Sequence, residues 1–547
     1  MKKKILTMLA LIFVIAMTIT GCGKTDPNVA ICSNGKFAGA EENGILAFKG
    51  IPYAKAPVGE LRWKAPVAAE DSKELKDAKE YGKSSIQYEW HSERIQTPVS
   101  EDCLTLNVWT KDLSEKNKPV MVFFHGGSFA WGGSSIELYS GKHIVEEHED
   151  VVVVSCNYRI GMMGFIDFSG VEGGEAFPDS RELGLLDSIE SLKWVKKNIA
   201  AFGGDPNNIT IFGESAGSTL VMCLMASDLT EGLFNRVICE SGSDNLTFTP
   251  EQFKESVQVD MLKLASGANT MDELMALTED ELIAANELSL DEDDMTVNDY
   301  YSLPLRGGKV VPADISEGIA KAKARGVDLM IGTNTDEIAY WVAEMGEIPI
   351  TEMDEEGVAL NLEIYEDVFI GSNYENICAT VTEEENEKID QYLENYSDLD
   401  DVWAKTKLVT EALFRQPTIK IADAYADAEG SGKIYTYYFG KKNSSFDFFG
   451  ACHASEIAYV FHNEEESEYS TGYDEDLADR MCESWVNFAK TGNPSNSSDT
   501  WTEYDTISRN TMVIGDDSTM KMESDPKGED RKLIGFLGEY NLWSAGA

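Results

Sequence analysis

Residues 209–225, ITIFGESAGSTLVMCLM, place a serine between a short run typical of a strand and a longer apolar run typical of a helix. Glycines stand two positions before and two positions after Ser215, at Gly213 and Gly217. Glycine permits the sharp, strained backbone of a strand-to-helix turn and the close packing of the helix that follows. A serine at the apex of such a turn holds its hydroxyl clear of the backbone. The stretch therefore predicts that Ser215 is a nucleophile.

The segments on either side of this turn follow the pattern of an α/β protein with a mostly parallel sheet. A helix is expected at 183–199, where apolar residues recur at helical spacing, and a second helix at 406–429. The strand, helix, strand order around 183–199 predicts a parallel pair with a right-handed crossover. Strands are expected at 29–37, 45–48, 119–124, 151–156, 209–212, 237–239, 329–331 and 433–439, with Asn34-Gly35 as a hairpin turn.

A serine hydroxyl needs a base within hydrogen-bond reach, and a carboxylate must orient that base. In proteins that carry such a turn, the chain order is serine, acid, histidine. Only His453 and His462 follow Ser215, and His453 lies in a loop of small residues after a strand, whereas His462 leads into an acidic run. His453 is therefore the predicted base, and His462 is interpreted as a surface histidine.

The acid is expected at the end of a strand between the serine and the histidine. The run LMIGTNTDE at 329–337 offers a strand followed by two adjacent carboxylates, Asp336 and Glu337. Both could accept a hydrogen bond from an imidazole. Chemistry and chain order alone leave both acids open.

A glycine-containing loop after the strand at 119–124 supplies the remaining part of a serine site. It resembles the HGGG-type loop of lipases and esterases, so Gly126, Gly127 and Ala216 are the predicted oxyanion-hole donors through their backbone N–H groups. His125 is interpreted as a brace of this loop. Three aromatic residues are substrate-pocket candidates, with ordinary core packing as the alternative: Phe129, Trp131 and Trp90.

The first 22 residues predict export. Lys2, Lys3 and Lys4 precede a largely apolar stretch, and small residues follow at Thr20-Gly21, as in a secretory signal. The end of this segment, ITGC, resembles the lipobox of bacterial lipoproteins. Residues 1–21 are therefore a predicted lipoprotein signal peptide, Cys22 a predicted lipidation site, and 22–28 a tether. The expected location is the cell surface, with a lipid anchor in the bacterial membrane.

Charge and cysteine spacing exclude several classes of function. Lys and Arg number 46 against 96 Asp and Glu, a net charge of −50, which disfavours binding to nucleic acid. The nine cysteines show no paired spacing of a zinc site, and the acidic clusters lack the pattern of a calcium loop. We expect neither a metal nor a cofactor.

Beyond these motifs, the chain resembles the type B carboxylesterase and cholinesterase family over about 29–515. The strings that carry the resemblance are FKGIPYA at 48–54, SEDCLTLNV at 100–108, NYRIG at 157–161, FGGDP at 202–206 and WVNFAKTGNP at 485–494. The resemblance implies an α/β-hydrolase fold with a large, mostly parallel sheet flanked by helices. It also implies Glu337 as the acid and an ion pair between Arg62 and Glu101. The family's usual partner cysteine for Cys103 is missing upstream, so Cys103 is expected to be unpaired.

These observations predict one catalytic domain at 29–547, with helical cap insertions at about 245–300 and 345–405. The predicted function is hydrolysis of small carboxylic esters through an acyl-enzyme formed on Ser215, with His453 and Glu337 completing the triad. Two alternatives use the same fold: hydrolysis of amides or peptides by the same triad, and a cholinesterase-like surface-binding protein without catalysis.

Overall fold

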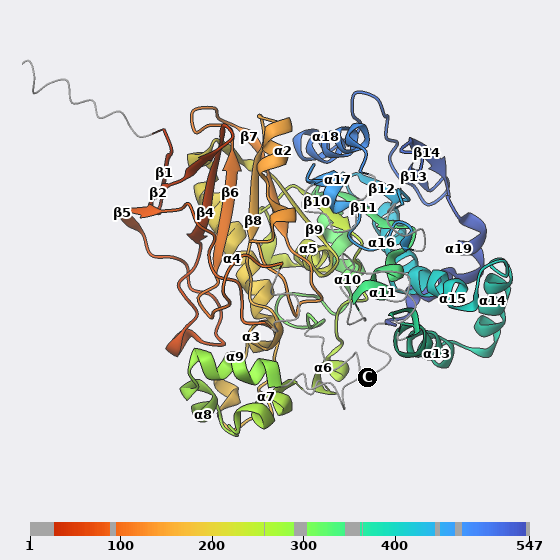
Figure 1. Ribbon diagram of the computed structural model, residues 1–547, viewed down its shortest axis with the longest axis horizontal. Coiled ribbons are helices and arrows are strands. Elements are labelled where there is room, and N and C mark those ends of the chain that lie inside the picture. Colours follow the sequence, from red (N-terminus) through yellow and green to blue (C-terminus); the bar gives the residue numbers. More distant parts are fainter. Residues whose placement is uncertain are drawn as a thin grey trace, which may run out of the picture.

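The computed structural model describes residues 27–87, 94–255, 258–288, 303–344, 361–363, 365–442, 449–464 and 473–542. Its strands are β1 (Val29–Cys32), β2 (Asn34–Ala38), β3 (Ala40–Glu42), β4 (Ile45–Pro52), β5 (Ser72–Asp77), β6 (Thr105–Thr110), β7 (Lys118–Phe124), β8 (Val152–Cys156), β9 (Gly204–Glu214), β10 (Arg236–Glu240), β11 (Asp328–Asn334), β12 (Ile434–Phe439), β13 (Asn510–Ile514) and β14 (Met520–Ser524). Eleven of these described strands form one sheet in the order β14-β13-β12-β11-β10-β9-β7-β8-β6-β4-β3 (Figure 1). Strands β7 to β13 run parallel to one another. At the ends of the sheet the pairs are antiparallel: β13 with β14 at one end, and β8 with β6, β6 with β4 and β4 with β3 at the other.

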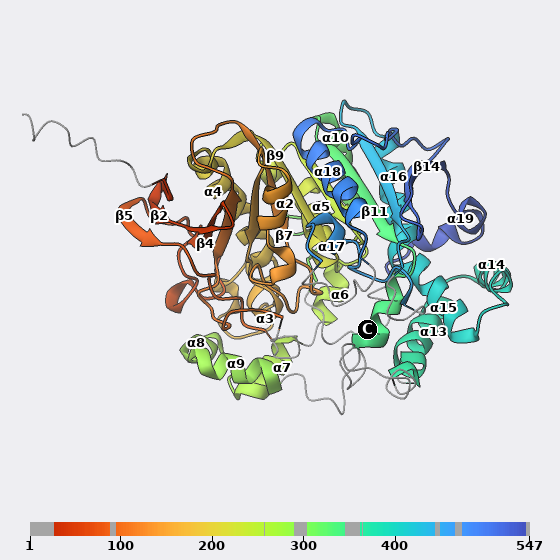
Figure 2. The same ribbon diagram turned by 45° about the horizontal axis from the view of Figure 1, so that its top comes forward.

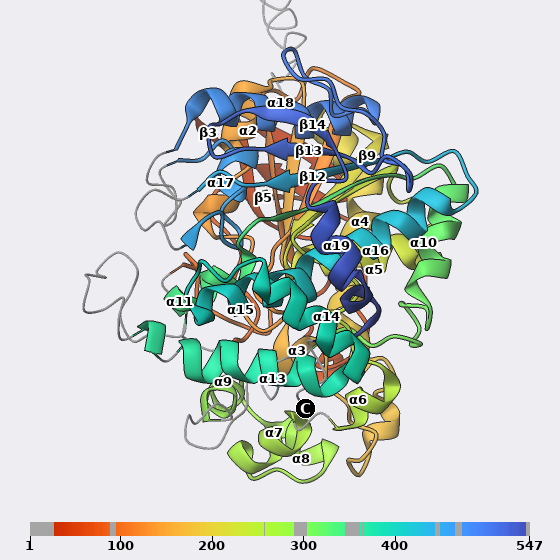
Figure 3. The same cartoon turned by 90° about the vertical axis from the view of Figure 1, so that its right-hand side faces the viewer.

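Helices cover both faces of the sheet, which explains why β7 and β8 are buried along their whole length. The covering helices are α2 (Lys142–Glu147), α4 (Leu183–Asn198), α5 (Ala216–Ala226), α10 (Ile315–Ala324), α16 (Gln416–Asp427), α17 (Ile457–Val460) and α18 (Glu475–Thr491). Helices α2, α17 and α18 lie on one face, and α4, α5, α10 and α16 on the other (Figure 3). Each face buries its own apolar cluster against the sheet.

Two further groups of helices lie beyond the carboxyl ends of the parallel strands. They are α6 (Pro250–Glu255), α7 (Gln258–Ser266), α8 (Met271–Ala276) and α9 (Glu279–Leu288), and then α13 (Gly371–Thr380), α14 (Glu383–Glu394) and α15 (Asp401–Thr410). Figures 1 and 2 place both groups on the side of the sheet where α3 (Gly161–Gly164) and α11 (Trp341–Glu344) follow β8 and β11. The described parts of the two predicted insertions are thus helical, and 289–302 and 345–360 lie outside the described residues.

The predicted strands are present, but the hairpin turn expected at Asn34-Gly35 falls one residue earlier, at Ser33-Asn34, because Cys32 pairs with Gly35. Two further differences concern how the elements connect. Strands β8 and β9 are parallel but not neighbours, because β7 lies between them and pairs with both. The helix expected at 406–429 is irregular in its middle: α15 ends at Thr410, a π-helical turn spans Glu411–Arg415, and α16 starts at Gln416. The residues at both junctions keep helical backbone angles, so the π-helical turn is a bulge within one continuous helix, and Pro417, which has no N–H to donate, stands just after it.

A buried ion pair ties the start of the chain to the first cap helices. Arg62 donates from Nε and Nη2 to the two carboxylate oxygens of Glu101, at 2.6 and 2.7 Å. Its Nη1 donates to the carbonyl of Leu277 at 2.7 Å. This is the pair that the family resemblance implies. Cys103 is a buried free thiol, as expected. The other described cysteines are also unpaired.

We expect Glu101→Leu to lower the free energy of unfolding by about 3 kcal/mol, because it leaves a buried guanidinium without its counter-charge. Urea denaturation of the purified protein measures this change. The control is Glu70→Ala, which breaks the ion pair between Lys55 and Glu70 on the surface. The exposed pair is expected to leave the urea midpoint unchanged, and equal losses in both variants would contradict the argument.

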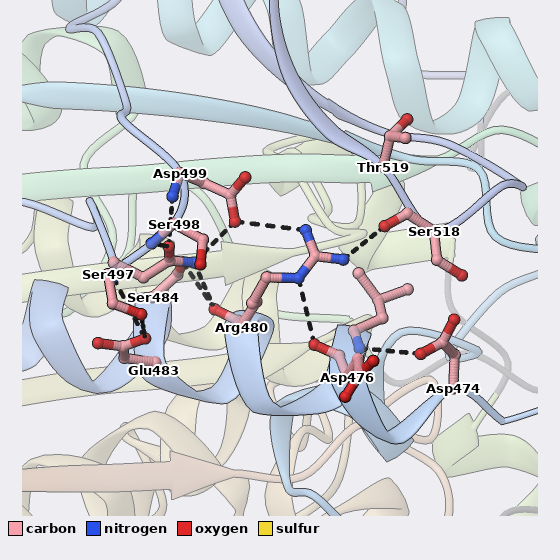
Figure 4. Close-up of polar contacts among 12 residues, drawn as sticks. Asp474, Asp476, Arg480, Glu483, Ser484, Ser497, Ser498, Asp499, Ser518 and Thr519 are labelled. Carbon is pink, nitrogen blue, oxygen red and sulfur yellow. Dashed lines mark hydrogen bonds and ion pairs between the residues drawn. The ribbon is translucent and has the colours of Figure 1, made fainter.

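A polar cluster around Arg480 joins α18 to the last hairpin of the sheet, which is formed by β13 and β14. The Arg480 guanidinium donates to the Asp499 carboxylate at 3.3 Å, to the Ser518 carbonyl at 2.5 Å and to the Asp476 carbonyl at 3.2 Å (Figure 4). Ser518 lies in the turn between β13 and β14, and Asp499 lies in the loop before them. One side chain therefore joins the helix, the loop and the hairpin at the edge of the sheet.

Candidate active site

Ser215 lies at the turn between β9 and α5, with φ +58° and ψ −123°. This strained backbone is the one that the flanking glycines predict. A methyl group on Gly213 would lie 2.6 Å from the backbone of Gly217, and one on Gly217 would lie 2.0 Å from the Phe124 carbonyl oxygen. Both glycines are therefore sterically required. The Ser215 side chain is half-buried, which leaves its hydroxyl accessible.

His453 and Glu337 come together from segments that are far apart in the chain. The Nδ1 atom of His453 lies 2.6 Å from Oε2 of Glu337, and both side chains are buried. The other carboxylate oxygen of Glu337 accepts the N–H of Asn334 at 2.7 Å, at the end of β11. A carboxylate that accepts from Nδ1 holds the imidazole in the tautomer whose Nε2 can accept a proton.

The structure separates the two adjacent acids that chemistry left open. Asp336 pairs with the ammonium group of Lys407 and accepts the N–H of Ala451 at 3.1 Å and the hydroxyl of Thr335 at 2.5 Å. Its carboxylate therefore braces the loop that carries His453. Glu337 is the acid in contact with the imidazole.

A second carboxylate faces the other ring nitrogen. Nε2 of His453 lies 3.1 Å from Oε1 of Glu214, the residue immediately before Ser215. Within the part of the chain that the structure describes, Ser215 and His453 make no hydrogen bond to each other, and such bonds are often long before substrate binds. Burial alone would lower the pKa of His453, but Glu214 and Glu337 raise it to about 9. Burial raises the pKa of Glu214.

The predicted oxyanion loop lies against the serine. A methyl group on Gly126 would lie 3.1 Å from Cβ of Ser215. Gly127 has φ +99°, and Ala216 is the first residue of α5, whose N–H has no partner within the helix. His125 is buried, stacks on Tyr158 at 4.5 Å and bonds through Nδ1 to the Gly126 carbonyl at 2.8 Å. It therefore braces the loop, as predicted.

The structure describes two of the three aromatic pocket candidates. Phe129 is wrong as a pocket residue: it is fully buried in the core and packs edge to face on Phe165, with ring centroids 5.2 Å apart. Trp131 is half-buried, and its ring lies 5.6 Å from the guanidinium carbon of Arg94. Arg94 in turn donates to the Tyr340 hydroxyl at 3.2 Å. Trp90 lies outside the described residues.

Three aromatic rings that the sequence analysis missed surround the imidazole. Phe414, Trp341 and Tyr340 have ring centroids 4.9, 5.4 and 5.8 Å from that of His453. Tyr340 and Trp341 follow Glu337 by three and four residues, a position that could have identified them. Phe414 lies in the π-helical turn Glu411–Arg415, and nothing in the local sequence marks it.

A second buried acid, Glu456, also went unnoticed. Its carboxylate accepts from Nδ2 of Asn334 at 2.5 Å and from the Ser241 hydroxyl at 3.3 Å. Asn334 also donates to the Cys452 carbonyl at 2.8 Å, next to the histidine. Burial, together with Glu337, raises the pKa of Glu456 to about 7. The position three residues after His453 is the only signal for it in the sequence.

His462, the rejected base, belongs to a group of three possible metal ligands at the surface. Ligand atoms of His462, Glu147 and Asp479 all lie within 4.8 Å of one another. The two carboxylates are exposed, and Nε2 of His462 is 2.9 Å from Asp479. The hydrogen bond between these two side chains accounts for the arrangement.

Comparison with known proteins places these features in one family. The profile described as "Carboxylesterase family" matches residues 26–533. The para-nitrobenzyl esterase of Bacillus subtilis is 34% identical over 516 residues, covering 92% of this chain and 98% of that protein. Acetylcholinesterase of Bungarus fasciatus is 28% identical and is covered over 76% of its length, against 83% of this chain.

Solved structures agree with the sequence relatives. A PNB esterase structure superposes with a TM-score of 0.76 at 30% identity, covering 93% of this chain and 99% of that one. A carboxylesterase of Geobacillus stearothermophilus gives the same TM-score and identity, covering 93% of this chain and 100% of that one. The fold is therefore the α/β-hydrolase fold. The chain belongs to the carboxylesterase family and is an enzyme that hydrolyses carboxylic esters.

Proposed function

We propose that Ser215 attacks the ester carbonyl, that His453 accepts the serine proton at Nε2, and that Glu337 orients the imidazole. The observation that carries this assignment is the 2.6 Å contact between Nδ1 of His453 and Glu337, with the strained Ser215 turn beside it. The tetrahedral intermediate expels the alcohol, which takes the proton from His453, and leaves an acyl group on Ser215. Water, deprotonated by His453, then releases the carboxylic acid.

The proposal assigns the oxyanion hole to the N–H groups of Gly126, Gly127 and Ala216. These groups belong to the loop that abuts Ser215 and to the first turn of α5. Backbone donors aimed at the developing negative charge are each worth about 3 kcal/mol where one has been removed. The absence of a side chain at both glycines allows the substrate carbonyl to approach the backbone.

The test is to trap the acyl-enzyme. Mixing the enzyme with an excess of a small p-nitrophenyl ester should give a burst of about one p-nitrophenolate per active site, followed by slower turnover. Mass spectrometry of the quenched protein should locate the acyl group on Ser215. Matched esters and anilides of the same acyl group would separate esterase from amidase activity, and hydrolysis without any acylated serine would rule out the mechanism.

The pH dependence should report the carboxylate beside Nε2. Glu214 and Glu337 raise the pKa of His453 to about 9, so the neutral, proton-accepting imidazole increases as pH rises towards that value. Without the negative charge of Glu214, the His453 imidazolium is less stable and the pKa of His453 falls. Glu214→Gln is therefore expected to move the acidic limb of kcat/KM to lower pH, measured with a neutral ester between pH 5 and 10. A limb that moves to higher pH, or does not move, would contradict this.

We also propose that residues 1–21 form a lipoprotein signal peptide and that Cys22 is lipidated, which anchors the enzyme at the bacterial cell surface. The ITGC string after an apolar segment supports this proposal. No helix within the described residues is long and apolar enough to cross a membrane.

Growth of an expressing strain with radioactive palmitate is expected to label the wild-type enzyme and not the Cys22→Ala variant. Lipid attachment requires the Cys22 thiol, and the other cysteines are buried or half-buried in the structure. The control is Cys378→Ala, which should stay labelled. A labelled Cys22→Ala protein, or an unlabelled wild type, would refute the anchor.

A further inference from the structure

The start of the chain forms a small sheet of its own. Strands β1, β2 and β5 pair in that order, separate from the eleven-stranded sheet, and Figures 1 and 2 show them at one end of the molecule. The register places Ile31 opposite Lys36, and Lys36 opposite Leu75. Residues directly opposite each other on neighbouring strands point to the same face. One face therefore carries the row Ile31, Lys36, Leu75, which we call the outer row.

The outer row is strongly exposed. Ile31 is 61% and Leu75 65% exposed, and Lys36 between them is also exposed. The opposite face of the same sheet carries Phe37, which is buried in the main core. Packing thus explains the inward face of this sheet, whereas the two aliphatic side chains of the outer row are left mostly exposed.

Charge is divided unevenly between this end and the rest of the chain. Residues 27–83, which include the whole small sheet, hold nine Lys and Arg and eight Asp and Glu. Residues 84–547 hold 33 Lys and Arg and 87 Asp and Glu. An anionic lipid surface repels the acidic remainder but not the nearly neutral end. Electrostatics therefore favour one orientation, with the small sheet towards the lipid.

We propose that the outer row is the surface through which this enzyme rests on the membrane. The proposal builds on lipidation of Cys22. From there, seven residues lead to Val29 at the start of β1, a distance of about 25 Å at full extension. The tether therefore holds the small sheet near the bilayer. Ile31 and Leu75 enter the headgroup region, and the Lys36 ammonium group lies among lipid phosphates.

The direct test places a fluorophore on the outer row of the lipid-anchored enzyme. Leu75→Cys and, as the control, Ile507→Cys are labelled with bimane, with unsubstituted enzyme as the blank for its own thiols. Ile507 is 94% exposed and lies in the loop before β13. In vesicles of phosphatidylglycerol and phosphatidylcholine containing nitroxide-labelled lipid, the label at 75 should be quenched several-fold more than the label at 507. Equal quenching at both positions would overturn the proposal.

Electrostatic orientation adds a second readout. The excess quenching at 75 should be larger in phosphatidylglycerol-containing vesicles than in pure phosphatidylcholine at 10 mM salt, and the difference should shrink at 0.5 M salt. Quenching at 75 that is insensitive to both lipid charge and salt would refute the charge argument.

A third measurement separates the outer row from the anchor. The chain produced without its signal peptide and with Cys22→Ala has no lipid, so any binding to sucrose-loaded vesicles comes from the protein surface. Ile31→Ser with Leu75→Ser should lower the bound fraction about tenfold. Leu264→Ser with Ile507→Ser, which removes two aliphatic side chains that are even more exposed and lie elsewhere, should not. If the wild-type enzyme took up no palmitate but the lipid-free chain still bound vesicles through Ile31 and Leu75, the anchor alone would be rejected. Equal binding by the two double variants would reject the outer row alone.

Discussion

Ser215→Ala is expected to lower kcat by about 10³-fold or more while leaving the protein folded, because the variant loses the atom that forms the acyl-enzyme. The elbow backbone does not depend on the hydroxyl: it is imposed by Gly213 and Gly217, whose added methyl groups would clash. KM should change much less than kcat. Initial rates with a p-nitrophenyl ester, together with circular dichroism, measure both properties.

His453→Ala should reduce kcat as much as Ser215→Ala does, and the double variant should be no worse than either single one. Groups that act as one unit are not additive, since removing one already disables the others. Matched controls are Ser227→Ala, at the opposite end of α5, and His462→Ala, which pairs with Asp479. Wild-type turnover in Ser215→Ala, or losses in His462→Ala as large as those in His453→Ala, would show that the base or nucleophile is misassigned.

Glu337→Gln is expected to lower kcat by about 10⁴-fold, because an amide in place of the carboxylate favours the wrong imidazole tautomer and no longer stabilises the imidazolium. The carboxylate contacts Nδ1 of His453 at 2.6 Å and accepts the N–H of Asn334, so the variant keeps nearly the same shape. The measurement is kcat under saturating ester, with the urea midpoint as a check on folding.

The adjacent Asp336→Asn is the matched control for that prediction. Asp336 contacts Lys407 and the N–H of Ala451, not the imidazole, and asparagine can still accept from Ala451. Its effect on kcat should stay within about tenfold, acting through the position of the histidine loop. If Asp336→Asn lost as much activity as Glu337→Gln, the assignment of the acid would have to be reversed.

Local sequence was sufficient for the parts of the site that depend on backbone geometry. The elbow at Ser215 and the loop at Gly126 and Gly127 are recognisable because only glycine tolerates the close approaches measured around them. The central strands are recognisable because burial on both faces demands continuous apolar runs. His453 could be selected because few histidines follow the serine. In each case the signal lies within a few residues of the feature.

Tertiary structure alone decided the parts that depend on contacts between distant segments. Glu337 and Asp336 are chemically equivalent neighbours. The family resemblance implied Glu337, but the physical reason lies in the fold, where Glu337 faces an imidazole 116 residues away while Asp336 pairs with Lys407. Phe129 was expected at the pocket and is buried in the core, because an aromatic side chain carries no local mark of the direction in which it points. Phe414 and Glu214 reach His453 from two different segments, and Glu456, three residues after His453, contacts Asn334 at the end of β11. The local sequence pattern determines which backbone conformation each segment adopts. The neighbours of a side chain are decided by the packing of segments against one another, and the sequence of one segment does not specify that packing.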